Sequence, residues 1–253
     1  MDRGDSMSIQ APDSADSEPK SAIGKLWQEL LAGSLKVESV RGEGFELVLA
    51  SAVAPAPTQR RARRQACFER ALRGEQQKSL AADFEKAPST LSGLVRSVAA
   101  EMGISAPLSK IPSALPLLTH AARSTCVVSL CEVGAERDPS QRWLLSFSYH
   151  DKILEAGLSS AEREVVRRYV RGQSYAQIAG ARGTSYRTIA NQLASAFGKL
   201  RVTGRLSLIR YIVECGAALG APVTVTLRAV PRLETRTASP QDEQAWPLRQ
   251  VNG

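Results

Sequence analysis

Two side chains close to residue 190 have the chemistry needed to read the edges of DNA bases. An arginine guanidinium can bond in a bidentate way to guanine, and an asparagine amide can do the same to adenine. Arg187 and Asn191 are four residues apart, so a helix would carry both on one face. The apolar residues Ile189, Leu193 and Phe197 would then lie on the opposite face. The pattern predicts a helix that buries one side and presents base-reading groups on the other.

Other residues of this region are candidates for contacts with phosphate, which fix the register of a protein on DNA without reading its sequence. The side chains suited to that role are Thr188, Gln192, Lys199 and Arg205. Local capping is an equal alternative for Thr188, and a solvated charge is the alternative for Lys199 and Arg205. We expect Ser185 only to cap the helix. The complete set of candidate contacts is Tyr186, Arg187, Thr188, Ala190, Asn191, Gln192, Ser195, Lys199 and Arg205.

The elements that must position this helix can be read from the residues around it. Gly172 ends a preceding helix, in a position where positive φ costs glycine little. Ser174 and Gln177 have the spacing of a capping box, which starts the next helix. The predicted helices are Ala161–Arg171, Tyr175–Ala181, Tyr186–Leu200 and Gly204–Cys215, with a turn at Arg182-Gly183-Thr184. Two helices joined by such a short turn are typical of the DNA-binding helix-turn-helix.

This region resembles the LuxR (GerE-type) helix-turn-helix family. The resemblance is carried by LSSAEREVVRRYVRGQSYAQIAGARGTSYRTIANQLASAFGKLRVTGR and the aliphatic helix after it, residues 158–215. It implies a four-helix domain that acts as a dimer, with the third helix in the major groove. Two positions depart from the family, because many members have lysine at Ala190 and histidine is frequent at Gln192. These departures concern the target sequence, and Ala190 can pack on a thymine methyl group.

The chain also resembles itself at an offset of 98 residues. This frame places Arg73-Gly74 on Arg171-Gly172 and Thr90-Leu91 on Thr188-Ile189, without a gap over about fifty residues. Apolar positions follow the same frame, namely Leu80 and Ile178, Val95 and Leu193, Met102 and Leu200, Ile104 and Val202, and Ile111 and Ile209. We therefore expect two tandem helix-turn-helix units.

Short β-strands are expected to flank each helical unit. Arg142–Tyr149 alternates apolar and polar side chains with the period of two that marks a half-buried strand, and Phe45–Ser51 lies 98 residues earlier. Cys126–Val133 and Thr224–Pro231 form a second such pair. The expected fold is α+β and mainly α, with a repeat of about 98 residues. Leu26–Leu35 is expected to form a short amphipathic helix.

The first unit is expected to be a weaker copy with a poor recognition surface. Its third helix, Pro88–Met102, has Ser89, Ser92, Gly93 and Leu94 at the positions of Arg187, Ala190, Asn191 and Gln192. Glu101 replaces Lys199, and a carboxylate there would repel DNA. Positive charge at the start of its first helix comes from Arg60, Arg61, Arg63 and Arg64. The sequence favours packing against the second unit or a partner over independent base reading, and leaves both open.

The distribution of charge favours two modules that face polyanions. The 253-residue chain has a formal net charge of +8, to which 60–117 contribute +5 and 158–215 contribute +7. No apolar run is long enough for a membrane span and no secretory signal is present, so a cytoplasmic protein is expected. The expected organisation is a disordered tail over 1–20, a degenerate helix-turn-helix unit with flanking strands over 21–134, a linker and strand over 135–157, the LuxR-type domain over 158–215, a strand segment over 216–231 and a disordered tail over 232–253.

Nothing in the sequence indicates catalysis, a cofactor or a metal site. His120 and His150 are far apart, and P-loop, GxSxG, HExxH and GxGxxG motifs are absent. The four cysteines form no CxxC pair, so we expect reduced residues in the core.

The leading interpretation is a DNA-binding transcriptional regulator, and not an enzyme. A protein-interaction adaptor or anti-activator, which binds another regulator or RNA polymerase, is the alternative. Arg187 and Asn191 favour DNA for the second unit, whereas Leu94 and Glu101 favour protein contact for the first. The expected partners are double-stranded DNA and a second copy of the chain, with a pseudo-dimer inside one chain as the alternative to a homodimer.

Overall fold

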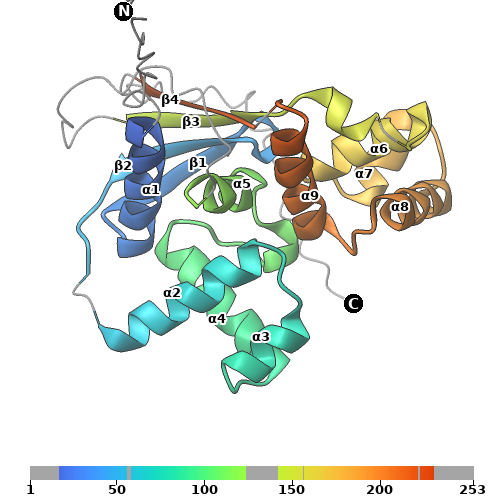
Figure 1. The fold of residues 1–253 in the computed structure, drawn as a ribbon. Coiled ribbons are helices and arrows are strands. Elements are labelled where there is room, and N and C mark those ends of the chain that lie inside the picture. The colour runs from blue at the N-terminus through green and yellow to red at the C-terminus, as the bar shows by residue number, and fades with distance from the viewer. Residues whose placement is uncertain (1–16, 56–57, 124–141, 156, 222, 231–253) are drawn as a thin grey trace, which may run out of the picture.

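The computed structural model describes residues 17–55, 58–123, 142–155, 157–221 and 223–230. Within these ranges the chain is mainly helical with one small antiparallel sheet, which makes the fold α+β (Figure 1). In chain order the elements are α1 (Ser17–Ala32), β1 (Leu35–Arg41), η1 (Gly42–Gly44), β2 (Glu46–Ser51), α2 (Gln59–Leu72), α3 (Gln77–Asp83), α4 (Pro88–Glu101), η2 (Leu108–Lys110), α5 (Ala114–Ala121), β3 (Arg142–Ser148), η3 (Asp151–Leu154), α6 (Ser160–Val170), α7 (Tyr175–Arg182), α8 (Tyr186–Leu200), α9 (Arg205–Ala218) and β4 (Thr224–Val230).

The sheet has the strand order β1-β2-β3-β4, and every neighbouring pair is antiparallel. Successive side chains of a strand point to opposite faces, so alternate residues reach the core. Leu47 and Leu49 on β2, and Trp143 and Leu145 on β3, are buried on that face. Helix α1 contacts β1 and helix α5 contacts β3, so both helices lie against the core face of the sheet (Figure 1).

Two groups of three helices connect the strands. We call α2, α3 and α4 the first trio, and α6, α7 and α8 the second trio. In each trio the first helix packs on the third, and the middle helix contacts both. Helix α5 follows the first trio and α9 follows the second, and these two helices pack against each other between the trios (Figure 1).

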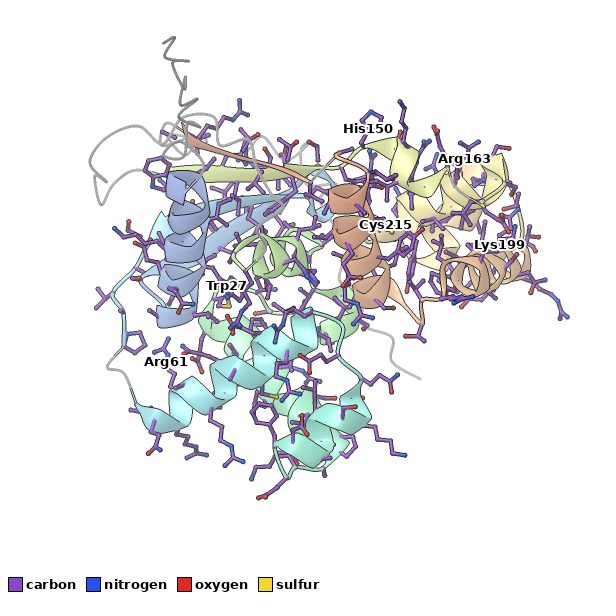
Figure 2. The ribbon with its side chains drawn as sticks, viewed as in Figure 1. Trp27, Arg61, His150, Arg163, Lys199 and Cys215 are labelled. Carbon is purple, nitrogen blue, oxygen red and sulfur yellow. The ribbon has the colours of Figure 1, made fainter. Side chains whose placement is uncertain are left out.

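A continuous hydrophobic core joins the sheet, α1 and both trios. Trp27 of α1 stacks on Phe68 of α2 with ring centroids 6.5 Å apart (Trp27 is labelled in Figure 2). The Trp27 Nε1 donates a hydrogen bond to the carboxylate of Glu69, and Arg123 forms an ion pair of 2.6 Å with the same carboxylate. These contacts attach the first trio to the helix that covers the sheet.

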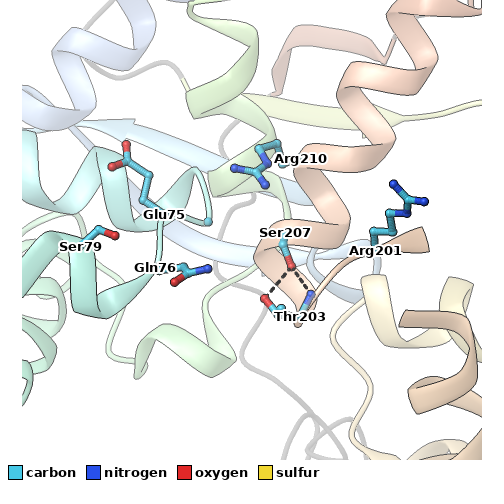
Figure 3. Close-up of a pocket in the computed structure, with 8 residues that line it drawn as sticks. Glu75, Gln76, Ser79, Arg201, Thr203, Ser207 and Arg210 are labelled. Carbon is cyan, nitrogen blue, oxygen red and sulfur yellow. Dashed lines mark hydrogen bonds between the residues drawn. The ribbon is translucent and has the colours of Figure 1, made fainter. Parts of the chain in front are cut away.

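The turn after α2 meets helix α9 at a close backbone contact beside a polar cleft. Gly74 has a φ of +77°, and a Cβ there would lie 3.0 Å from the backbone of Leu206 and of Ser207. Only glycine fits both the conformation and the space. A cleft of about 380 Å³ opens beside this contact, with Glu75 on one side and Arg210 on the other (Figure 3).

The N-terminal elements differ from the expectation. Helix α1 includes residues 17–20, which were expected to belong to a disordered tail, and it ends before Leu35. Gly33, with a φ of +80°, follows the helix, and Leu35 and Val37 are the buried residues of strand β1. This strand was not predicted, because the alternation in LKVESVR is too short to separate it from a helix end.

Three expected strands are confirmed, since β2 lies within Phe45–Ser51, β3 within Arg142–Tyr149 and β4 within Thr224–Pro231. The strand expected at Cys126–Val133 lies outside the described residues, as do 1–16, 134–141 and 232–253. None of the helices in the described ranges combines the length and the apolar character that a bilayer crossing needs.

Candidate nucleic-acid interface

Three local signals build the turn between α7 and α8. Ser174 and Gln177 form a capping box at the start of α7, with hydrogen bonds of 3.3 and 2.8 Å. Gly183 adopts a left-handed conformation with a φ of +60° and ends α7. Ser185 caps α8 by accepting a hydrogen bond of 3.1 Å from the backbone amide of Thr188. These predictions from the sequence are confirmed.

The inward face of α8 is apolar and buried. Ile189, Leu193 and Ala196 have no exposed surface, and they hold α8 against α6 and α7. Phe197, which was expected in the buried stripe, is half-buried and packs at its edge against Tyr169, with ring centroids 5.6 Å apart. The expectation was wrong by one position, because a period of 3.6 residues brings Ala196 to the inward face after Leu193.

Arg187 and Asn191 are exposed on the outward face of α8. Neither forms a hydrogen bond or an ion pair with any residue in the described part of the chain. Tyr186 is 59% exposed, and its ring lies 5.5 Å from that of Tyr175, while Ala190 is half-buried. The first two turns of α8 therefore present a guanidinium and an amide that are free to bond with a ligand.

Two residues expected to contact phosphate are bonded within the second trio. The Thr188 Oγ1 lies 2.9 Å from the Ser185 Oγ, so Thr188 takes part in the cap of its own helix. The Gln192 Oε1 accepts a hydrogen bond of 2.7 Å from Arg182. Arg182 also forms an ion pair of 3.2 Å with Glu164, and its side chain is 15% exposed. These bonds hold the turn and α8 to α6.

Ser195 and Lys199 share the carboxylate of Glu162 on α6. The Ser195 Oγ donates to it at 2.7 Å, and the Lys199 Nζ donates to both carboxylate oxygens at 2.9 and 2.7 Å (Lys199 is labelled in Figure 2). The Glu162 side chain is 8% exposed and also accepts from the amide of Ser159 at 2.8 Å. Bonds from Lys199, then Ser195, then the Ser159 amide lower the pKa of Glu162 to about 2. The Lys199 charge is therefore balanced inside the protein.

Arg205 is directed into the protein. Its Nη2 donates a hydrogen bond of 2.5 Å to the backbone carbonyl of Ile111, in the connection before α5. Burial lowers the pKa of the guanidinium. Arg205 thus links α9 to the segment before α5, and it is not available to phosphate in this structure.

The first trio uses three of its four expected arginines internally. Arg61 donates to two backbone carbonyls at the end of α1, Arg63 donates to the backbone after α3, and Arg64 bonds to Glu101 at 2.7 Å. Arg60 is exposed and has no partner among the described residues. On α4, Ser89, Ser92 and Gly93 are exposed and Leu94 is half-buried.

Sequence reasoning missed Glu162, which organises the second half of α8. A signal was present, since Ser159 and Glu162 have the spacing of a capping box, and the structure contains both of its hydrogen bonds. That spacing does not reveal the contact with Lys199, because 37 residues separate the two.

The histidines and cysteines have structural surroundings. The His150 Nδ1 accepts a hydrogen bond of 3.2 Å from the amide of Lys152 at the start of η3, and burial lowers the pKa of His120 to about 4. Cys67 and Cys215 are free thiols, and Cys67 is buried as expected. Within the described ranges, no group of histidine, cysteine and carboxylate side chains is arranged to hold a metal ion.

This part of the chain matches a known protein family. The GerE model, described as bacterial regulatory proteins of the luxR family, matches residues 156–212. The matched segment contains the second trio, the capped turn and the exposed pair on α8. It confirms the resemblance seen in the sequence and suggests a DNA-binding transcription regulator. No curated protein and no solved structure gave a match.

Proposed function

We propose that this protein is a sequence-specific transcriptional regulator that inserts α8 into the major groove of DNA. The observation that carries the proposal is the exposed, unbonded pair Arg187 and Asn191, inside the segment that matches the luxR family. A guanidinium suits guanine and an amide suits adenine. Ala190 lies between them and can pack on a thymine methyl group, and Tyr186 extends the same face. The protein acts in the cytoplasm, where bacterial DNA lies.

Contacts with phosphate would come from the rim of this face. Lys199 is 44% exposed, so its ammonium can reach a phosphate oxygen while it stays near Glu162. Thr188 and Gln192 are secondary contacts, because each first has to share a bond it already makes. Ser195 bonds to Glu162 and acts mainly by holding Lys199 and α8 in place. Arg205 is not in the proposed set.

We further propose that the two trios are tandem copies of one unit. Helices α3 and α7 begin 98 residues apart, and so do α4 and α8. Eight pairs of buried residues keep this offset, namely Cys67 and Val165, Phe68 and Val166, Leu72 and Val170, Leu80 and Ile178, Leu91 and Ile189, Val95 and Leu193, Val98 and Ala196, and Met102 and Leu200.

Backbone conformation supports the same frame. Positive φ occurs at Gly74 and Gly172, at Glu85 and Gly183, and at Gly103 and Arg201, and each pair is 98 residues apart. A positive φ is uncommon outside glycine, so its recurrence where glycine is absent from one copy argues for a shared local fold. Each trio therefore ends its helices at corresponding residues.

The register of the sheet supports a two-fold relation between the copies. Leu47 on β2 pairs with Leu145 on β3, and these residues are 98 apart. Val48 pairs with Leu144, and the offset of 98 residues relates Val48 to Ser146 and Leu144 to Glu46. Glu46 and Ser146 are also paired with each other. The register is thus unchanged by exchange of the two strands, as a two-fold axis through the leucine pair requires. We propose that one chain is a pseudo-dimer, with the α5–α9 contact on its axis.

Selection of bound duplexes from a random pool tests the proposed function. Wild type and Arg187→Ala would be compared side by side, at low salt where phosphate contacts are strongest. Enrichment of one motif by the wild type, with a changed preference in the variant, is the expected result. Absence of any enrichment by folded wild-type protein would overturn the proposal and would favour an adaptor that binds another regulator or RNA polymerase.

A further inference from the structure

The outward face of α4 is open to solvent. Helix α4 packs on α2, α3 and η2, and it makes no comparable contact with the second trio in the described part of the chain. Ser89, Ser92, Gly93 and Arg96 follow the spacing of one helix face, and all four are exposed. A Cβ placed on Gly93 would meet no atom within 4 Å. Packing against the second trio therefore does not explain this face.

Three exposed cations lie on α4 and on the segment that precedes it. Lys78 on α3, Lys86 in the turn and Arg96 on α4 are all exposed, and none forms an ion pair with a described residue. The other members of the face, Ser89, Ser92 and Gly93, are small, so a polyanion could approach α4 closely. We call Lys78, Lys86 and Arg96 the cationic rim.

The carboxylates of the same elements are mostly neutralised. Asp83 forms an ion pair with Arg70, and Glu101 forms one with Arg64 at 2.7 Å. Glu85 in the turn is exposed and has no such partner among the described residues, so it opposes one of the three cations. The rim therefore keeps a net positive charge.

The two trios differ in the side chains that suit contact with DNA. Under the offset of 98 residues, Lys78, Lys86 and Arg96 correspond to the uncharged Ala176, Thr184 and Ala194. In the reverse sense, Ser89 and Gly93 replace Arg187 and Asn191. At these three positions the second trio has no cation, whereas the first trio has cations beside a helix that lacks the base-reading pair.

We propose that the first trio lays the α4 face on the sugar-phosphate backbone beside the site that α8 reads, and holds DNA there without sequence preference. This inference rests on the proposed function and on the two-fold relation of the trios. Helix α8 lies farther from the sheet than α6 (Figure 1), so we expect its outward face to be directed away from the sheet. Two copies related by a two-fold axis point the same way along that axis. The outward face of α4 is therefore expected to be directed away from the sheet as well.

The consequence is an asymmetric site for a single chain. Specificity comes from one half-site, and affinity comes from both sides of the axis. Arg96, Lys78 and Lys86 supply contacts that release counterions, and these contacts make binding depend on salt. A second copy of the chain is not needed to cover the adjacent turn of the duplex.

The test compares two triple variants of the full chain on the duplex chosen by selection, extended by about one helical turn on each side. One is Lys78→Gln, Lys86→Gln, Arg96→Gln. The matched control is Lys36→Gln, Lys152→Gln, Arg228→Gln, which removes three exposed cations from β1, η3 and β4. Circular dichroism would verify the fold of both, and hydroxyl-radical footprints and the salt dependence of Kd would be measured.

For the α4 variant we expect the slope of log K against log salt to become shallower by about 0.9 for each phosphate that is no longer neutralised, or about 3 in total. Its footprint should shorten on one side while the preferred motif stays the same, and the control should match wild type. A footprint and slope equal to wild type in the α4 variant would overturn this inference alone. A changed motif would also overturn it, because the face would then read bases. Wild-type protein that binds no DNA would overturn the proposed function as well.

Discussion

Arg64 on α2 donates a hydrogen bond of 2.7 Å to Glu101 on α4, and so bridges the first and third helices of its trio. The bridge recurs 98 residues later between Glu162 and Lys199, with acid and base exchanged. A serine of the third helix completes each one, bonding to Arg64 at 2.6 Å in the first trio and to Glu162 at 2.7 Å in the second. Both trios therefore hold an ion pair at this position, with opposite polarity. A lysine at position 199 is not by itself an argument for contact with phosphate.

Exchange of the charges in the second bridge tests whether the second trio requires such a pair. Glu162→Lys alone brings two ammonium groups together and breaks the capping box of α6, so we expect the free energy of unfolding to fall by about 2–4 kcal/mol. Addition of Lys199→Glu restores a pair with the polarity found in the first trio and should recover part of the loss. Urea unfolding measures both variants. A double variant no more stable than Glu162→Lys would contradict the requirement for a pair.

The pH dependence of stability tests the same carboxylate. The pKa of Glu162 is about 2 in the folded protein, below the usual value of about 4.3. Since the folded pKa is depressed, its stabilising effect is complete above the unfolded value and is lost as the pH falls toward about 2. Lys199→Met removes the largest cause, so its Glu162 pKa should rise and its stability should fall less steeply in this range. Carboxyl NMR titration provides the measurement, and equal pKa values in both proteins would exclude Lys199 as the main partner.

Local signals made the second trio predictable from the sequence. Ser174, Gly183 and Ser185 act within a few residues of themselves, and the apolar period sets which face of α8 is buried. Arg187 and Asn191 followed from that period, and the structure leaves both exposed. These features depend on near neighbours in the chain, which a single sequence contains.

The contacts that change the candidate site are long-range. Lys199 with Glu162 and Arg205 with Ile111 join segments that are 37 and 94 residues apart. Their pairing depends on how α6, α8 and α9 pack in three dimensions, and no local pattern encodes it. Strand β1 was missed for a related reason, because its short alternation becomes a strand only when β2 pairs with it.

Replacement of Gly74 tests the contact between the turn after α2 and helix α9. Gly74→Ala combines a φ of +77° with a Cβ only 3.0 Å from backbone atoms of α9. We expect the free energy of unfolding to fall by about 1–3 kcal/mol. Gly198→Ala is the matched control, because that glycine lies in α8 with no atom near the new Cβ, and it should gain about 0.5–1 kcal/mol. Equal effects of the two substitutions in chemical unfolding would mean that the contact does not constrain the fold.

Base reading and phosphate contact can be separated on the duplex chosen by selection. Arg187→Ala should cost about 1–3 kcal/mol of binding free energy and relax the preference at one base pair, because it removes a bidentate pair of hydrogen bonds. Lys199→Ala should weaken all duplexes similarly, because a phosphate contact carries no sequence information. Competition binding with single-base variants of the duplex measures both effects.

The first trio supplies the controls for this separation. Ser89→Ala and Glu101→Gln change the positions that correspond to Arg187 and Lys199, and both should leave affinity and base preference nearly unchanged. Ser89 lies on the α4 face but carries no charge, and Glu101 is occupied by Arg64. If Arg187→Ala and Lys199→Ala reduced base preference equally, α8 would not divide its contacts in this way. A loss of base preference in Ser89→Ala would instead assign base reading to both trios.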